Sequence, residues 1–225
     1  MKLAALVIWY DEDPQDLYEM TMSLGGFADS VVALDGAFAN FPSATATSDD
    51  AQAAALACGC ADSGIELLVH QTPTVGEWIG FEGEEVAKRN AAFKLAAALS
   101  PDWVVIVDAD MRLAKHDGGR DLLDWTDLDV AQTNVEGGAH RHVFRWMPTL
   151  RYFRTHYLAL TSTKRLSGPP GRTLLTDQLP PLAPALDLYH LVEFSHVEKR
   201  NQQRRQSANA YYQSRDERGV ERIPE

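Results

Sequence analysis

Two aspartates, Asp108 and Asp110, form the feature of the sequence most able to do chemistry. They close the run Val-Val-Ile-Val-Asp-Ala-Asp, in which an apolar stretch stops at two carboxylates one residue apart. Side chains two apart on a strand point the same way, so both carboxylates can reach one divalent ion. Carboxylate oxygens suit Mg²⁺ or Mn²⁺, and such an ion would neutralise charge on a nucleotide leaving group. The alternative is a solvated acidic turn.

Further candidates end two other apolar runs. Asp35 closes Ser-Val-Val-Ala-Leu-Asp, and an acidic residue in this place often accepts hydrogen bonds from a ribose or base. It could equally form a turn or cap a helix. Trp9 and Tyr10 close the first apolar run of the chain, where aromatic rings either stack on a base or complete the core. No glycine-rich phosphate loop is present here, which argues against a dinucleotide dehydrogenase or a P-loop enzyme.

A histidine and a basic segment follow near the end of the chain. His196 precedes a stripe with helical spacing, made of Arg200, Arg204, Ala208, Tyr211 and Arg215. His196 could be a third metal ligand, with Arg200 and Arg204 reaching phosphate oxygens. Alternatively, the histidine is structural and the arginines form a solvated helix face.

The first half of the chain alternates apolar runs with helical patterns. Strands are predicted over 3–9, 30–34, 65–69 and 103–107, and helices from Pro14 (with Asp13 as N-cap) to Gly25, from Asp49 to about Gly59, and over 82–99. This order predicts an α/β fold with a mainly parallel sheet flanked by helices. Ligands of such sheets bind at the carboxyl ends of the strands, where the acidic residues lie.

The second half has a different pattern. Strands are predicted over 128–135, 142–146 and 187–195, a polar segment rich in Arg, Tyr and His over 149–160, a loop over 166–184 and a helix over 197–215. We expect mixed or antiparallel pairing within one domain over 1–225. Its parts are a nucleotide-sugar-binding half (1–115), an acceptor half (116–196) and a basic helix and tail (197–225).

Composition limits the classes of function. The 225 residues are 45% hydrophobic with a net charge of −11, which indicates a globular chain that does not bind duplex nucleic acid through its overall field. No run reaches the length of a membrane span. Cys58 and Cys60 are too close for an ordinary disulfide and have no distant partner, so we expect two small buried or half-buried thiols and a cytoplasmic protein.

Together these motifs resemble the family 2 glycosyltransferases with the GT-A fold. Trp9-Tyr10-Asp11-Glu12 is similar to the family's Tyr-Asn-Glu element, Asp35-Gly36 to its Asp-Gly-Ser turn, and Lys88-Arg89-Asn90 followed by Asp108-Ala-Asp110 to its Arg-Asn…Asp-x-Asp stretch. Arg151-Tyr-Phe-Arg154 and the segment that begins at His196 resemble the closing elements of a bacterial subgroup. Ala37 departs from the family's serine, and residues 166–184 give no clear match to its Glu-Asp base element.

The resemblance implies a hexosyltransferase-class glycosyltransferase that uses Mn²⁺ or Mg²⁺, a UDP- or GDP-sugar, and a small-molecule or glycan acceptor. It implies metal ligands at Asp108, Asp110 and His196; donor contacts at Trp9, Tyr10, Asp11, Asp35, Arg89, Asp108, Arg200 and Arg204; and acceptor contacts at Arg151, Arg154, His156 and Tyr157. Transfer with inversion also needs a carboxylate base, for which Asp177 and Glu193 are candidates, with Asp187 as a further one. The rival functions are a nucleotidyltransferase, a metal-dependent phosphohydrolase and a non-catalytic nucleotide-sugar-binding protein.

Overall fold

The computed structural model describes residues 1–10, 12–36, 47–71, 81–153, 155–168 and 180–197. Its strands are β1 Leu3–Trp9, β2 Ser30–Asp35, β3 Glu66–Gln71, β4 Trp103–Asp108, β5 Met111–His116, β6 Val130–Val135, β7 Gly138–Arg145, β8 Arg151–Phe153, β9 Thr155–Leu160, β10 Leu186–Asp187 and β11 Val192–His196. Its helices are α1 Pro14–Ser23, α2 Asp50–Ser63, α3 Phe81–Ala96 and α4 Gly119–Trp125, and a 3₁₀ turn, Ala97–Leu99, follows α3.

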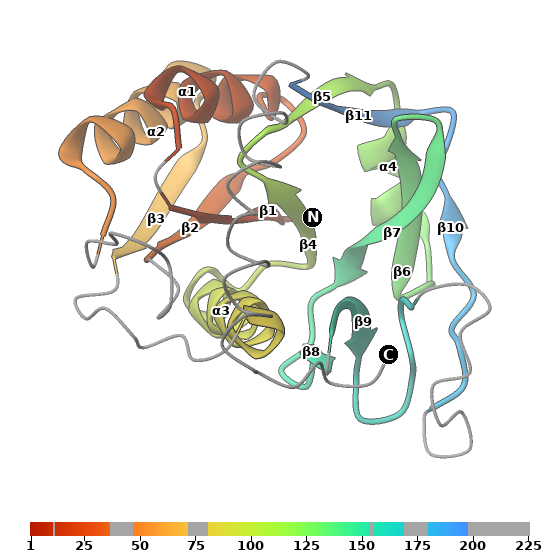
Figure 1. The fold of residues 1–225 in the computed structure, drawn as a ribbon. Helices are drawn as coiled ribbons and strands as arrows, with labels where there is room; N and C mark the ends of the chain where they lie inside the picture. Colours follow the sequence, from red (N-terminus) through yellow and green to blue (C-terminus); the bar gives the residue numbers. More distant parts are fainter. Residues whose placement is uncertain (11, 37–46, 72–80, 154, 169–179, 198–225) are drawn as a thin grey trace.

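One sheet dominates the structure (Figure 1). Eight strands follow the order β3-β2-β1-β4-β7-β6-β11-β5, β10 pairs with β6, and a separate hairpin joins β8 to β9. The four strands from β3 to β4 run parallel, so their carboxyl ends meet at one edge. Beyond them the pairs are mixed, because β7 is antiparallel to both β4 and β6. The α/β class predicted from the sequence, with a mainly parallel half and a mixed half in one sheet flanked by helices, is confirmed.

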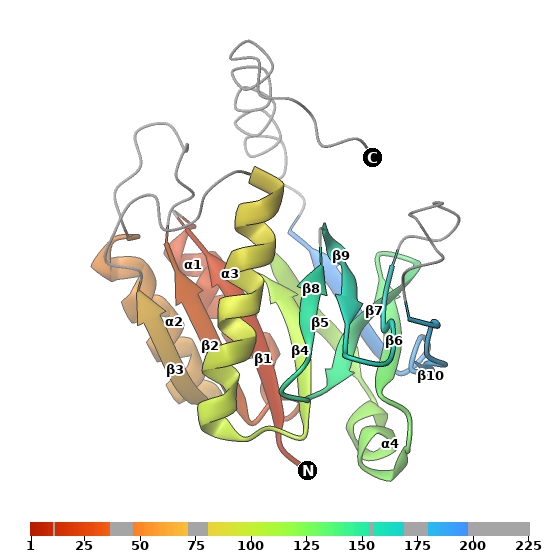
Figure 2. The same ribbon diagram turned by 90° about the horizontal axis from the view of Figure 1, so that it is seen from below.

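Helices cover both faces of the parallel half. α1 and α2 lie on one face and α3 lies on the other (Figure 2). The alternation of a strand divides β1 between them: Ala5 and Val7 belong to the core under α1 and α2, whereas Ala4 and Leu6 belong to the core under α3. Burial on both faces explains why the sequence shows an unbroken apolar run here instead of an alternating one.

Capping side chains set the helix ends. The Asp13 carboxylate accepts from the Gln15 backbone N–H at 2.7 Å with Pro14 in the first turn, and the Asp49 carboxylate accepts from the Gln52 N–H at 3.1 Å. The N-cap at Asp13 and the start of the second helix at Asp49 were predicted and are confirmed. At the other end of α2, Gly64 takes a left-handed conformation with φ of 70°, which glycine adopts without the steric cost of a Cβ.

The predicted end of α2 near Gly59 is wrong, because the helix continues to Ser63. Gly59 lies against α1, where an added Cβ would stand 1.9 Å from the Thr21 hydroxyl oxygen and 2.7 Å from the Tyr18 carbonyl oxygen. The glycine therefore allows close helix packing and does not break the helix. Of the two thiols next to it, Cys60 is buried as expected, whereas Cys58 is exposed.

The second half departs further from the sequence prediction. Residues predicted as one strand over 187–195 form β10 and β11, separated by a turn in which Leu191 and Val192 donate to the Leu188 carbonyl. β5 and α4 were not predicted, and the strand expected from residue 142 already begins at Gly138. The predicted helix over 197–215 lies outside the described residues.

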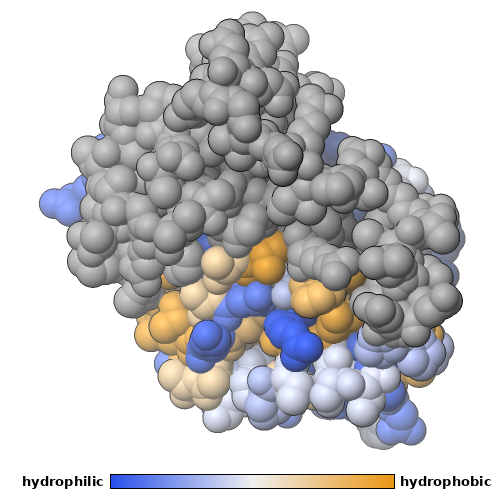
Figure 3. All heavy atoms as spheres, turned by 60° about the horizontal axis from the view of Figure 1, so that its bottom comes forward, coloured by the Kyte–Doolittle hydropathy of each residue, from blue (hydrophilic) through white to orange (hydrophobic). Residues whose placement is uncertain are grey.

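The face that carries α3 and the β8–β9 hairpin is shown in Figure 3. In the coloured part of this face, hydrophobic residues lie on both sides of a few strongly hydrophilic ones. Among the described residues, no helix is long and apolar enough to cross a membrane.

Candidate active site

The carboxyl edge of the parallel strands brings together three of the predicted donor-binding segments. In the strand register, Trp9 is paired with Asp35, and Ile8 is paired with Asp108. The ends of β1, β2 and β4 are therefore neighbours, as the sequence predicted. This is the edge at which open α/β sheets bind their ligands.

The aromatic pair at the end of β1 divides into two environments. Trp9 is 2% exposed and packs in the core under α1 and α2, and its indole Nε1 has no hydrogen-bond partner among the described residues. A ring so covered completes the core, which is one of the two alternatives left open by the sequence, and the donor contact of Trp9 stays a prediction. Tyr10 is half-buried, and its donor contact stays a prediction.

Asp35 is held within the protein. Its carboxylate accepts from the Ser48 N–H at 2.8 Å, from the Ser48 hydroxyl at 2.7 Å and from the Gly36 N–H at 2.8 Å. Gly36 has a φ of 142°, in the region that favours glycine. These contacts match the turn-forming alternative for Asp35, and its contact with a nucleoside stays a prediction.

A buried lysine joins the ends of β1 and β2. Lys88 of α3 is 1% exposed, and its ammonium donates to the Trp9 carbonyl at 2.7 Å and to the Gly36 carbonyl at 2.6 Å. Burying an ammonium is costly unless it is hydrogen-bonded, so these bonds hold both strand ends close to α3. The sequence analysis gave this lysine no role. The available signal was that Lys88 precedes the buried Ala92 and Ala96 at four-residue spacing, which places it on the packed face of the helix.

The acidic turn between β4 and β5 is tied to α3 by a neighbouring residue, Arg89. Its guanidinium donates to the Asp108 carboxylate at 2.8 Å, from a side chain that is 9% exposed to one that is 45% exposed. The Asp108 N–H points to the Met111 sulfur at 3.3 Å, which closes the turn. Arg89 therefore lies beside Asp108 and is paired with its carboxylate, and its donor contact stays a prediction.

The second carboxylate of the turn, Asp110, is in an environment that disfavours its negative charge. Burial, and then the negative charge of Asp108, raise the pKa of the Asp110 carboxyl above its usual value, while the charges of His196 and Arg112 offset part of this. Two carboxylates are therefore held near each other in a partly buried place with incomplete compensation. Such a place favours a cation.

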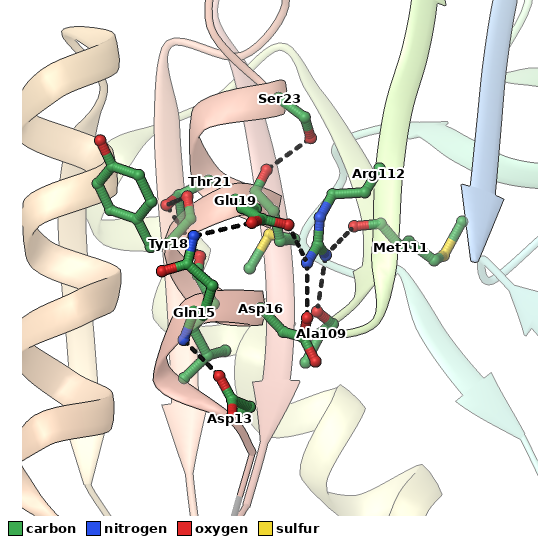
Figure 4. Close-up of polar contacts among 12 residues, drawn as sticks. Asp13, Gln15, Asp16, Tyr18, Glu19, Thr21, Ser23, Ala109, Met111 and Arg112 are labelled. Carbon is green, nitrogen blue, oxygen red and sulfur yellow. Dashed lines mark hydrogen bonds and ion pairs between the residues drawn. The ribbon is translucent and has the colours of Figure 1, made fainter. Parts of the chain in front are cut away.

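Arg112 fixes the back of this turn against α1 (Figure 4). Its guanidinium donates to the Ala109 and Met111 carbonyls at 3.4 and 3.0 Å, and to the Asp16 and Glu19 carboxylates at 3.1 and 3.5 Å. One planar fork therefore connects the backbone of the turn to two acids of the helix. The sequence offered no signal for this contact, because its partners are more than 90 residues apart.

His196 reaches the turn through the pairing of β11 with β5. It is opposite Met111 in the ladder, and the next residue, Val197, donates its N–H to the Asp110 carbonyl at 3.0 Å. Its Nδ1 lies 3.2 Å from the Glu136 carboxylate. His196 is therefore close to Asp110, as expected for a third ligand. However, the described residues form no group of three or more His, Cys, Asp or Glu side chains placed to hold a metal, so the three-ligand set stays a prediction.

A second histidine, His142 of β7, lies within electrostatic reach of Asp108 and His196. Its Nε2 lies 2.8 Å from the Thr133 hydroxyl, and its ring meets that of Phe194 edge-on at 5.0 Å. Burial lowers the pKa of His142 to about 4, and the nearby His140 adds to the effect, while the charge of Asp108 opposes it. His142 is therefore a neutral imidazole at physiological pH.

Other predicted residues are not brought to the turn. Glu193 is paired with Lys115 on β5, three residues before His196, and three strand residues span about 10 Å. Arg151 is an exposed residue at the start of β8. Five of the candidates, and the side chains of two more, lie outside the described residues: Asp11, Arg154, Asp177, Arg200 and Arg204, with His156 and Tyr157.

Comparison with known proteins gives a distant structural similarity. No protein-family model and no curated protein matches the chain. Among solved structures, it is similar to S. aureus TarS 1–349, with 20% identity, a TM-score of 0.42, and coverage of 61% of this chain and 37% of that one. It is also similar to TarS 1–349 in complex with UDP, with 21% identity, a TM-score of 0.41, and coverage of 60% and 36%. The chain thus spans little more than a third of these two structures.

Proposed function

We propose that this chain is a metal-dependent glycosyltransferase that moves a sugar from a nucleoside-diphosphate sugar to an acceptor hydroxyl. The observation that carries the proposal is the Asp108–Asp110 turn. Its two neighbouring carboxylates lie at the carboxyl edge where β1, β2 and β4 end, with Arg89 beside Asp108. This is an arrangement suited to a diphosphate and its counter-ion.

The residues of the turn fit a divalent cation. Two carboxylates supply the hard oxygen ligands that Mg²⁺ and Mn²⁺ take, and a cation would relieve the repulsion that raises the Asp110 pKa. Mg²⁺ is usually held by one or two carboxylates together with substrate phosphates, so a third protein ligand is not required. In this proposal Asp108 and Asp110 hold the ion, with His196 as an additional ligand, and the bound ion neutralises charge on the leaving nucleoside diphosphate.

In this proposal, residues of the protein hold the strand ends and the acidic turn in place and bind the donor and the acceptor. Lys88 fixes the two strand ends beside the nucleoside, and Arg112 keeps the turn from shifting away from α1. Arg89 provides positive charge next to the leaving group, where charge develops in the transition state. Arg200 and Arg204 are proposed to bind the donor phosphates, and Arg151, Arg154, His156 and Tyr157 to bind the acceptor.

The test is release of nucleoside diphosphate from a panel of UDP-, GDP- and dTDP-sugars, with Mn²⁺ or with a chelator. We expect slow Mn²⁺-dependent release from one donor, lost by about 100-fold or more in Asp110→Asn. Asp117→Asn is the matched control, because the same change is made in an exposed aspartate beyond β5. Release of pyrophosphate from nucleoside triphosphates, or phosphate from simple esters, would instead indicate a nucleotidyltransferase or a phosphohydrolase. Metal-dependent binding without turnover would indicate a non-catalytic binding protein.

A further inference from the structure

An open groove lies between α3 and the segment that leads into β8. Its volume is about 460 Å³, within the range of small-molecule sites. Its apolar wall includes Phe93 of α3 together with Trp146 and Met147. It lies one to two helical turns past Arg89 along α3, away from the acidic turn, at about 1.5 Å per residue.

The two walls are held at a fixed spacing. The Asn90 side chain accepts from the Tyr152 N–H at 2.7 Å and donates to the Tyr152 carbonyl at 3.1 Å, which fastens α3 to β8. Below this contact the Phe93 and Tyr152 rings stack with centroids 5.5 Å apart. On the opposite side, a turn closed by the Leu150 N–H and the Met147 carbonyl at 2.9 Å shapes the rim. The groove is therefore pre-formed.

The groove is lined by positive charge, whereas the protein as a whole is negatively charged. Its lining holds two cations, Lys94 and Arg151, and no acidic residue, in a chain with 32 acidic against 21 basic residues. Within the described part of the chain, neither cation has an ion pair or a hydrogen-bond partner, and both are exposed. The Asn90 amide is already occupied, so these two cations are the charged groups available to a ligand.

We propose that this groove binds a small anion with an apolar body, such as a carboxylate or phosphate monoester on an aliphatic or aromatic group. The apolar body would lie against Phe93, Trp146 and Met147, and the anionic head would lie between Lys94 and Arg151. Figure 3 shows this face, where hydrophobic surface lies beside strongly hydrophilic residues. The site is distinct from the donor edge, and it shares Arg151 with the proposed acceptor contacts. Binding of an anion in the groove does not require the transfer reaction.

The test uses three probes of equal chain length, namely octanoate, 1-octanol and octylammonium. Binding is followed by two-dimensional ¹H–¹⁵N NMR of the indole N–H signals, with that of Trp146 assigned from Trp146→Phe. We expect octanoate to shift the Trp146 signal in a saturable way, octanol to bind more weakly and octylammonium not to bind. Lys94→Gln and Arg151→Gln should each weaken octanoate binding by about 2- to 5-fold, and Lys115→Gln on β5 should not. UDP with Mn²⁺ should leave octanoate bound.

Several outcomes would overturn the proposal. Equal binding of octanoate and octanol, or equal octanoate affinity in all the variants, would show that Lys94 and Arg151 do not bind the carboxylate head. Absence of any saturable shift, with co-sedimentation of the protein on phosphatidylglycerol vesicles, would assign the face to a membrane surface. Displacement of octanoate by UDP would make the groove part of the donor site. None of these results depends on turnover, so the groove and the transferase proposal can fail separately.

Discussion

The parallel half and the mixed half of the sheet are built in different ways. Almost every residue of β1, β2 and β4 is buried, and helices cover both faces. In β5, β6, β7 and β11, buried residues are interspersed with partly or fully exposed ones, and two of the pairings contain an irregularity in register. The first half is thus a rigid support shaped by burial, whereas the second leaves polar residues such as His140 and Glu136 exposed.

The acidic turn sits where these two halves join. Asp108 ends the parallel half and Met111 begins the mixed half, so the two carboxylates are positioned from both sides. The parallel half therefore supplies rigid strand ends that carry Asp35 and Asp108, and the mixed half adds His196 from β11. The following changes test that division, from the largest expected effect to the smallest.

Lys88→Met tests whether the parallel half depends on the buried ammonium of Lys88. The variant leaves the Trp9 and Gly36 carbonyls without their donor, and each unpaired buried acceptor costs about 1–3 kcal/mol. We expect the free energy of unfolding to fall by about 2–5 kcal/mol in urea denaturation. Lys94→Met on the exposed face of the same helix should change it by less than about 0.5 kcal/mol. A similarly small loss of unfolding free energy in both variants would show that Lys88 does not stabilise the fold.

His142 tests whether pH sensitivity belongs to the mixed half. Its pKa is about 4 in the folded protein and about 6.5 when unfolded, so protons bind the unfolded chain more readily. Stability should be complete above pH 6.5 and decline as pH falls toward 4, by roughly 3 kcal/mol from this residue. Urea unfolding at pH 7, 5.5 and 4 should show a shallower decline in His142→Gln. Parallel pH profiles for the two proteins would contradict the assignment.

Gly59→Ala tests the packing of the parallel half away from the site. The added methyl group would collide with Thr21 and the Tyr18 carbonyl, and overpacking of this kind costs about 1–3 kcal/mol. Thermal unfolding should show the loss, and the double variant Thr21→Ala/Gly59→Ala should be less destabilised than the sum of the two single changes. Strict additivity would mean that α1 and α2 move apart instead of colliding.

Asp110→Asn gives the smallest change in stability, and its sign is the informative part. Because the folded pKa of Asp110 is raised, the unfolded chain ionises first, so the penalty on folding grows as pH rises above the unfolded pKa and is complete above the folded pKa. The amide carries no charge, so the variant should be slightly more stable than the parent at pH 7. The gain should vanish below the unfolded pKa of about 3.9. A variant less stable at pH 7 would show that the carboxylate is structural, against a role in binding a cation.

The fold was predictable from the sequence where a strand is buried on both faces and its residues form an unbroken apolar run. β1 was predicted with its observed bounds, and β2 and β4 to within one residue, because unbroken apolar runs end at aspartates. β5 was missed because, of its six residues, Met111 and Leu113 are the two that are buried. The turn that splits β10 from β11 depends on backbone bonds to Leu188, which leave no clear sign in composition.

The candidate site was predictable only in part. The proximity of Asp35, Asp108 and the end of β1 followed from the rule that parallel strands share an edge. The contacts of Lys88 and Arg112 did not, because they join segments far apart in the chain through single side chains. The burial of Trp9 was also not decided by sequence, since an aromatic residue at a strand end suits both the core and a ligand.

The two thiols of α2 allow separation of α1 from α2 to be measured by thiol labelling of the native protein. Cys58 is exposed, whereas Cys60 is buried against α1 and burial raises its pKa to about 12, so that little thiolate is present. A maleimide should therefore attach to one position in the folded chain and provide a single site for a fluorophore. The second thiol becomes reactive when α2 separates from α1, and the rate of that second labelling measures how often the helix pair opens.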